Sequence, residues 1–120
     1  MREETRKILS LPDLPVYATA VRIPVHTGHA ESVYVETERV ATLSGVLEAL
    51  GAAPGVGLPD DPSEFPTPLE VAGVDGTYVG RVRVQGRMVQ YWCVADNLLK
   101  GAATNAVQIA ESLAGIHARA

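Results

Sequence analysis

The sequence predicts a single α+β domain. Alternating apolar and polar residues indicate four strands, and apolar residues at helical spacing indicate three helices. Only Gln85-Gly86-Arg87 separates two of the strands, and so short a connection containing glycine is typical of an antiparallel hairpin. A chain of 120 residues can bury one core. We therefore expect residues 1–120 to form one α+β domain.

Three elements are expected in the N-terminal third. Residues 2–10 predict a helix, with acidic residues early and basic residues late, the order that the helix dipole favours. Residues 16–25 and residues 32–38 each alternate in polarity and predict two strands with one face in the core. In the first of these strands one face carries Tyr17, Thr19, Val21, Ile23 and Val25, and the other carries Ala18, Ala20 and Arg22.

The middle of the chain predicts a short helix and a long loop. The helix covers residues 42–50, with Thr42 as its cap and Gly51 at its end. Residues 54–76 are rich in proline and glycine, and a loop of this length is often functional or interfacial. Within it, the pair Asp60-Asp61 fits a solvated turn better than a cation site.

The hairpin strands, residues 78–84 and 88–95, lead into a C-terminal helix. Arg81 and Arg83 share one strand face, which is either solvated or covered by a partner chain. Asp96 is placed to cap the helix. Small residues at 101–103 let either a ligand or the sheet approach the first turn closely. The apolar stripe of the helix consists of Leu99, Ala102, Ala106, Ile109, Leu113 and Ile116.

Composition limits the partners and the compartment. Hydrophobic residues make up 47% and charged residues 20% of the chain, which is ordinary for a folded domain. The net charge is −4 without a basic run, and no apolar run reaches membrane-spanning length, so neither nucleic acid nor a membrane is an expected partner. Cys93 is the only cysteine, which excludes an intrachain disulfide and fits a reducing cytoplasm.

The densest group of chemically useful side chains lies in residues 22–31. This stretch holds Arg22, His26, His29 and Glu31. The planar fork of an arginine matches a carboxylate, and histidine has an ordinary pKa suited to a general base. The stretch therefore indicates either a carboxylate clamp beside a proton acceptor or a solvated surface turn.

Several blocks resemble, in order, the C-terminal part of bacterial aspartate-β-semialdehyde dehydrogenase, from about Glu4 to Leu113. They are Ala20-Val21-Arg22-Ile23-Pro24-Val25, Gly28-His29-Ala30-Glu31, Phe65-Pro66-Thr67-Pro68-Leu69-Glu70, Tyr78-Val79-Gly80-Arg81-Val82-Arg83 and Ala95-Asp96-Asn97-Leu98-Leu99-Lys100-Gly101. The resemblance implies the C-terminal domain shared with glyceraldehyde-3-phosphate dehydrogenase-like enzymes. That domain has a mixed, mainly antiparallel sheet covered by helices.

The resemblance also implies a reaction and residue roles. The family reduces aspartyl phosphate with NADPH to aspartate semialdehyde and phosphate, a step in lysine, threonine and methionine biosynthesis. Matching motif to motif, Arg22 stands where the family grips the substrate α-carboxylate, and His29 stands where it has its catalytic acid/base. Asn97 stands at an amide residue that contacts NADP.

The sequence departs from the whole family pattern in one important way. The family's nucleophilic cysteine, its substrate-binding glutamine and its glycine-rich NADP-binding half lie upstream of the matched blocks, and this sequence does not contain them. Cys93 lies in a strand where the family commonly has an apolar residue, so we interpret it as a buried structural thiol. We therefore expect no dehydrogenase activity from this chain alone.

Two other functions are considered beside the enzymatic one. The first is a non-catalytic dimerisation fragment, pairing as a homodimer or with the missing half through the Arg81 and Arg83 face and the 54–76 loop. In the family the last helix packs on the nucleotide-binding half, so its stripe should here be covered by another copy or exposed. The second is a metal site using His26, His29 and Asp60 or Asp61, a weak signal without further ligands.

Overall fold

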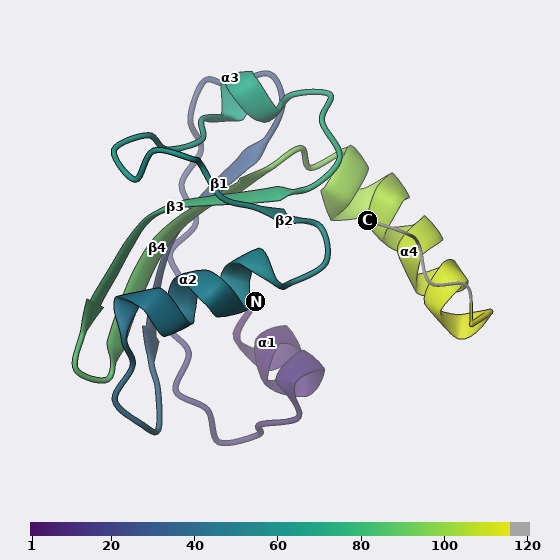
Figure 1. Cartoon of the computed structure of the whole chain (residues 1–120). Helices are drawn as coiled ribbons and strands as arrows, with labels where there is room; N and C mark the ends of the chain where they lie inside the picture. The colour runs from purple at the N-terminus through teal and green to yellow at the C-terminus, as the bar shows by residue number, and fades with distance from the viewer. Residues whose placement is uncertain (116–120) are drawn as a thin grey trace.

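The computed structural model describes residues 1–115 and confirms an α+β fold with a mixed sheet (Figure 1). The elements in chain order are α1 (Arg2–Leu9), β1 (His29–Glu36), α2 (Leu43–Gly51), β2 (Val56–Gly57), α3 (Pro68–Val71), β3 (Thr77–Gln85), β4 (Met88–Ala95), the π-helical turn η1 (Leu99–Ala103) and α4 (Thr104–Leu113). The predicted 54–76 loop therefore contains a short strand and a single turn of helix.

The sheet has the order β1-β4-β3-β2. β4 pairs antiparallel with β1 on one side and with β3 on the other, and β2 adds two residues parallel to β3. The hairpin of β3 and β4 turns at Gly86, whose φ of 61° is readily adopted by glycine. The sheet is thus mainly antiparallel, as the resemblance implies.

The core is small and lies on both sides of β4 and its neighbours. The buried apolar residues among the described ones are Val71, Val79, Val89 and Val94. α2 and α3 lie on opposite sides of the sheet (Figure 1). α2 begins at Thr42, whose side-chain oxygen accepts a hydrogen bond from the Gly45 N–H, as the sequence predicts.

The predicted strand over residues 16–25 is wrong. These residues run without hydrogen-bonded strand pairing, and Tyr17 and Val21 are almost fully exposed. A strand exists only when a neighbouring strand takes up its backbone hydrogen bonds, and no described segment does so here. Alternation alone therefore marks a segment that is able to form a strand.

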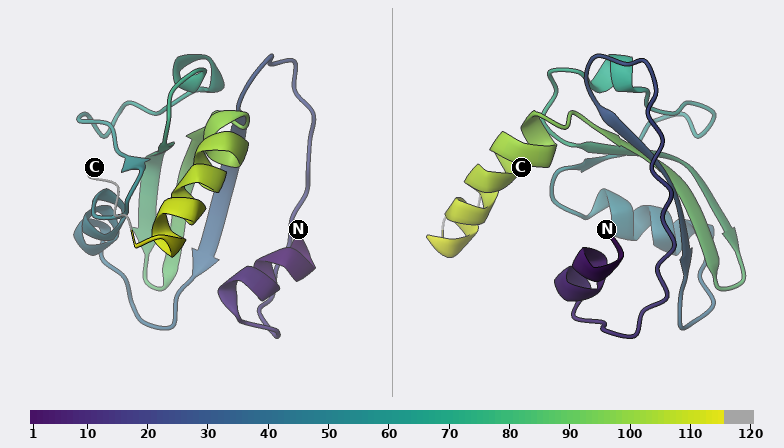
Figure 2. Two further views of the ribbon diagram at one scale, coloured as in Figure 1. Left: turned by 90° about the vertical axis from the view of Figure 1, so that its right-hand side faces the viewer. Right: turned by 180° about the vertical axis from the view of Figure 1, so that it is seen from behind.

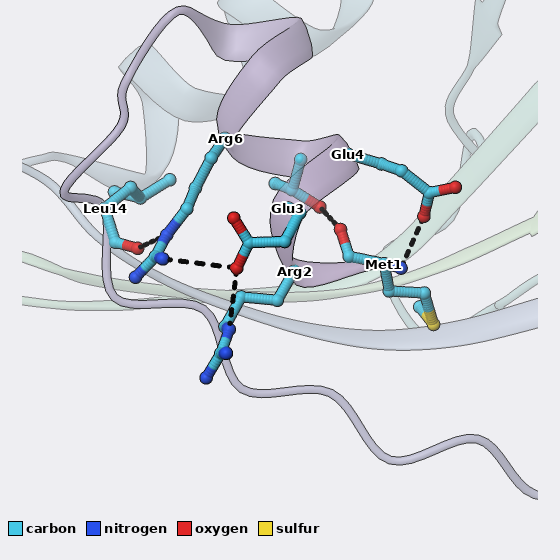
Figure 3. Close-up of polar contacts among 7 residues, drawn as sticks. Met1, Arg2, Glu3, Glu4, Arg6 and Leu14 are labelled. Atoms are coloured by element: carbon cyan, nitrogen blue, oxygen red, sulfur yellow. Dashed lines mark hydrogen bonds and ion pairs between the residues drawn. The ribbon is translucent and has the colours of Figure 1, made fainter.

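α1 is confirmed as a helix, but it is held by polar contacts at its ends (Figure 3). The Arg6 Nε donates to the Leu14 carbonyl oxygen at 2.8 Å and ties the helix to the chain that follows it. Glu3 lies beside Arg2 and Arg6, at 3.2 and 3.4 Å. These ion pairs are exposed and contribute little stability. No residue of α1 is buried.

α4 extends away from the sheet (Figures 1 and 2), and its apolar stripe is open. Ile109 is 53% and Leu113 is 85% exposed, and Ala102 and Ala106 are also exposed. We expected this stripe to be either covered by another copy or exposed, and in the structure it is exposed. Ile116, the last residue of the predicted stripe, lies outside the described residues. Close packing of residues 101–103 on the sheet is not seen.

The domain exposes far more surface than a compact monomer. Its accessible surface is 9347 Å², whereas a compact monomer of 12.7 kDa exposes about 6,200 Å². α1, residues 11–27 and α4 contain no buried residue, and they lie outside the sheet (Figure 2). The stable part of the molecule is therefore the sheet with α2 and α3.

Truncating a core side chain tests this assignment of the core. Val94 is fully buried, and Val94→Ala removes methyl groups and leaves a cavity, so it should lower the free energy of unfolding by about 2 kcal/mol. Urea unfolding followed by the fluorescence of Trp92, the single tryptophan, measures the change. Val21→Ala is the control, because Val21 is 81% exposed; equal losses for both variants would contradict this core.

Candidate functional site

Two of the three predicted site residues, His29 and Asn97, lie on the rim where β1 begins and β4 ends. His29, the first residue of β1, is opposite Ala95, the last residue of β4. The residues on either side of this pair therefore meet across the rim: Gly28 before β1 and Asn97 after β4. The Gly28 N–H donates to the Asn97 side-chain oxygen Oδ1 at 2.7 Å, and this bond joins two parts of the chain that are far apart in sequence.

Gly28 is required at this turn by conformation and by space. Its φ is +99°, a left-handed value that a side chain disfavours. A Cβ at this position would lie 3.1 Å from the Cβ of Pro68 and 3.5 Å from the Ala95 carbonyl oxygen. The start of α3 thus presses on the turn that delivers His29, and together with the Asn97 bond it fixes the backbone of that turn.

Asp96 holds the other side of the rim. It is 3% exposed, and its carboxylate accepts hydrogen bonds from the N–H groups of Gly73 at 2.8 Å, Leu98 at 2.8 Å and Leu99 at 3.3 Å. These bonds, that from Gly73 foremost, hold the pKa of Asp96 below its usual value despite its burial. The N-cap residue of η1 is Leu98, and Asp96 holds the turn that leads into it by accepting from the Leu98 and Leu99 N–H groups. Asp96 also anchors the turn after α3, which the sequence did not indicate.

The remaining site residues lie differently. The His29 side chain is exposed at the rim, and Asn97 is half-buried there. Arg22 is exposed in the unpaired segment that leads into the Gly28 turn. The structure thus brings Asn97 into contact with the turn that precedes His29. Arg22 is connected to the same turn along the chain, in a segment that no sheet hydrogen bond holds. The roles of all three residues stay predictions.

Cys93 does not resemble a nucleophile. It is half-buried in β4, and burial, with a smaller effect from the charge of Glu31, raises its pKa to about 11. The thiolate is the reactive form of cysteine, so at neutral pH this thiol is almost entirely protonated. A structural thiol, as interpreted from the sequence, fits this environment.

A second concave region lies on one face of the sheet. Arg81 and Arg83 both line a hollow of about 300 Å³, so they share a face as predicted. Arg81 sits at a bulge in β3 with φ of 53°, and its guanidinium lies 3.9 Å from the ring centre of Phe65. The rest of its lining comes from β1 and β4: Ser32, Val33, Tyr34, Gln90, Tyr91 and Trp92.

The described residues form neither a metal-binding cluster nor a membrane-spanning helix. Within residues 1–115 no three His, Cys, Asp or Glu side chains are placed to share a metal ion, so His26, His29 and the Asp60-Asp61 pair do not form such a group. None of the described helices combines the length and apolarity needed to cross a bilayer.

Comparison with known proteins identifies the family. The family model described as "Semialdehyde dehydrogenase, dimerisation domain" matches residues 1–100. The chain belongs to this family. The same dimerisation domain is what the resemblance in the sequence implied, and the hollow and the rim described above lie within the matched residues.

Curated relatives and solved structures agree with this assignment. Aspartate-semialdehyde dehydrogenase from Bacillus subtilis is 50% identical over 119 residues, and that from Aquifex aeolicus is 48% identical over 118 residues. Each match covers 94% of this chain, but only 34% and 35% of the relative. The crystal structure of aspartate semialdehyde dehydrogenase II from Vibrio cholerae, complexed with ASA, matches with a TM-score of 0.86 at 44% identity, covering 93% of this chain and 34% of that one. The chain therefore spans about a third of the length of its relatives.

The steric requirement at Gly28 can be separated from the conformational one. Gly28→Ala and Gly86→Ala both place a side chain at positive φ, but a Cβ at Gly86 meets nothing within 4 Å. We expect Gly28→Ala to lower the melting temperature more than Gly86→Ala does, because it also displaces Pro68. Thermal unfolding by circular dichroism measures both, and equal losses would show that Pro68 does not confine the turn.

Asp96 gives a stability that depends on pH. Its pKa is lowered in the fold, so its contribution is present above the unfolded pKa and is lost as the pH falls through the folded pKa. Asp96→Asn should therefore melt below the parent at pH 7, and the gap should shrink once the pH falls below about 4. Melting curves from pH 7 to pH 2.5 test this, and a constant gap would show that the charge of Asp96 has no such role.

Proposed function

We propose that this chain is the substrate-binding and dimerisation part of an NADP-dependent aspartate-semialdehyde dehydrogenase. Membership of the dimerisation-domain family and identity near 50% to dehydrogenases from two bacteria support the proposal. The observation that carries it is the rim itself, where the Gly28–Asn97 hydrogen bond holds the turn that presents His29. The reaction would be the cytoplasmic reduction of aspartyl phosphate to aspartate semialdehyde and phosphate, a step toward lysine, threonine and methionine.

The residues of this chain supply binding and proton transfer in that reaction. The Arg22 guanidinium offers paired N–H donors to the α-carboxylate of the substrate. The His29 imidazole accepts the proton released when a thiol attacks the acyl phosphate, and it returns a proton when the thiol leaves the product. Cys93 is not that thiol because its pKa is too high, so the attacking sulfur belongs to the rest of the enzyme.

The chain fits NADP only as a minor contributor to its site. NADPH supplies hydride when it is bound. On the described rim, the Asn97 oxygen is already taken by the Gly28 N–H, which leaves its NH₂ group as the donor available to a cofactor. One amide cannot hold a dinucleotide. Binding of the cofactor therefore depends on the two-thirds of the relatives that this chain does not span.

A second role, assembly, is favoured by the hollow on the sheet. Arg81 and Arg83 line it, and neither makes an ion pair with any residue in the described part of the chain. Arginine and aromatic side chains are enriched at protein interfaces. A homodimer in which this face meets a second copy is compatible with the catalytic role, since an incomplete enzyme is still able to dimerise.

The isolated chain should show no phosphate-dependent reduction of NADP in the presence of aspartate semialdehyde. The physical reason is the lack of an activated thiol among its side chains. The assay follows absorbance of the reduced cofactor, with the full-length Bacillus subtilis enzyme as the positive control. Turnover approaching that of the control would refute the assignment of the nucleophile to the rest of the enzyme.

The two catalytic roles can be tested in a chimera that carries this chain in place of the matching third of the Bacillus subtilis enzyme. His29→Gln should lower kcat by about 10²- to 10⁴-fold, with KM little changed, because it removes proton transfer. Arg22→Lys should lower kcat/KM by about 10- to 100-fold, mainly through KM, because it loses the paired contact.

His26→Gln and Arg39→Lys are the matched controls for these variants, since both residues are exposed and neither is assigned a role. Both controls should behave as the unchanged chimera. A fall in activity for His26→Gln equal to that for His29→Gln would move the acid/base away from His29.

The assembly role predicts a particle of twice 12.7 kDa in size-exclusion chromatography with light scattering at high protein concentration. Arg83→Glu should shift this particle toward monomer, because each copy would then place a negative charge in the hollow where the dimer interface has a positive one. Arg39→Glu makes the same charge change at an exposed site outside the hollow and should leave the dimer intact. A strict monomer for the unchanged chain would exclude the homodimer.

A further inference from the structure

The segment that leads into α3 is held against the sheet at one defined point. Trp92 in β4 lies directly opposite Gly80 in β3. The Trp92 indole N–H donates to the Pro66 carbonyl oxygen at 2.8 Å. A Cβ at Gly80 would lie only 2.9 Å from the Pro66 Cδ and 3.1 Å from the Phe65 Cα. A hydrogen-bond donor on β4 and a missing side chain on β3 therefore fix residues 65 and 66 together.

Residues 65–68 are stiff enough to carry that position forward to Pro68. The rings of Pro66 and Pro68 restrict the φ angles of both residues. Thr67, between them, is held by the capping box of α3: the Glu70 carboxylate accepts from the Thr67 N–H at 2.9 Å and from its hydroxyl at 2.7 Å. A shift of Pro66 would therefore move Pro68 with it.

The far end of α3 is held from the same strand. The Asp96 carboxylate, directly after β4, accepts from the Gly73 N–H at 2.8 Å. Trp92 and Asp96 thus hold the chain before and after the single turn of α3. Pro68, the first residue of that turn, lies against Gly28, where a Cβ would be 3.1 Å from the Pro68 Cβ. β4 therefore positions the Gly28 turn through α3 as well as through its pairing with β1.

We propose that Trp92 is a positioning residue for His29, an inference that rests on the proposed function of His29 as the acid/base. Trp92 precedes Ala95, the partner of His29, by three residues, which is about 10 Å along a strand. Its effect on the rim therefore passes through Pro66 and Pro68 to the turn that His29 follows. A small displacement of a catalytic group is enough to slow a reaction.

Hydrogen exchange followed by NMR in the isolated chain tests the positioning without a catalytic readout. Trp92→Phe removes the indole donor and keeps an aromatic ring. The Gly28 amide, which donates to Asn97, should then exchange at least about 10-fold faster. The Thr37 amide, which donates to the Arg87 carbonyl oxygen just past the other end of β1, should keep its rate. Equal acceleration of both amides, or an unchanged rate at Gly28, would overturn the proposal.

Gly80→Ala disturbs the same segment from β3 and gives an independent variant. The new Cβ would displace residues 65 and 66 by contact alone, because the φ of Gly80 is not left-handed. It should accelerate exchange of the Gly28 amide. Gly51→Ala is the matched control, since Gly51 also has an ordinary φ and its Cβ would meet its nearest atom at 3.6 Å. Equal acceleration by the two alanine variants would contradict the proposal.

A positioning role predicts a loss in kcat that depends on His29. In the chimera with the Bacillus subtilis enzyme, Trp92→Phe should lower kcat by about 3- to 30-fold with KM little changed. Added to His29→Gln, it should lower kcat by less than about two-fold further, because the group that it positions is already gone. Tyr78→Phe, the control in β3, should leave kcat unchanged. Full additivity of the two substitutions would contradict an action through His29.

An effect on assembly gives a different result, because Trp92 also lines the hollow. Light scattering on the same samples should show one particle size for the chimera with and without Trp92→Phe. A fall in kcat that accompanies dissociation would assign the indole to assembly and would overturn the proposal.

Failure of the proposed function is also distinguishable. If His29→Gln leaves kcat of the chimera unchanged while Trp92→Phe accelerates only the Gly28 amide, the indole positions the turn and the acid/base assignment alone is wrong. If His29→Gln abolishes turnover while the Gly28 amide does not respond to Trp92→Phe, the acid/base assignment stands and the positioning role is wrong.

Discussion

The structure depends on the two-sided pairing of β4. This strand exchanges backbone hydrogen bonds with β1 along one edge and with β3 along the other, and it contributes Val94 to the small core. Because β4 ends beside the start of β1, the same pairing brings Gly28 to Asn97 and creates the rim. The hydrogen bond between them is a consequence of the sheet register, and a slip by one residue would break it and turn His29 to the other face.

The rim combines rigid and unsupported parts in a way that suits an incomplete site. Asp96 binds three backbone N–H groups, and Pro68 confines Gly28, so the backbone around His29 is well held. Arg22 is carried by a segment without such support. A catalytic site needs its groups held in fixed geometry. The exposed surface is large, and the relatives are about three times as long as this chain. We therefore expect the support for the Arg22 segment to come from the rest of the enzyme.

Local features were predictable from the sequence. Thr42 and Gly51 bound a helix because a cap and a terminating glycine act within a few residues, and Gly86 marks the hairpin for the same reason. Family motifs then supplied Arg22, His29 and Asn97 as candidates. The Gly28–Asn97 contact and the Gly73–Asp96 contact join distant parts of the chain, and no local pattern predicts which distant groups will meet. The strand at residues 16–25 failed because strand formation depends on a partner, which alternation does not reveal.

The central claim is that Arg22 and His29 belong to one pocket that closes only when the rest of the enzyme is present. A crystal structure of the chimera with aspartate semialdehyde bound tests it most directly. The account predicts the Arg22 guanidinium within hydrogen-bonding distance, about 3 Å, of the substrate carboxylate, with the His29 imidazole beside the reacting carbon. A substrate bound with either side chain turned away from it would contradict the account.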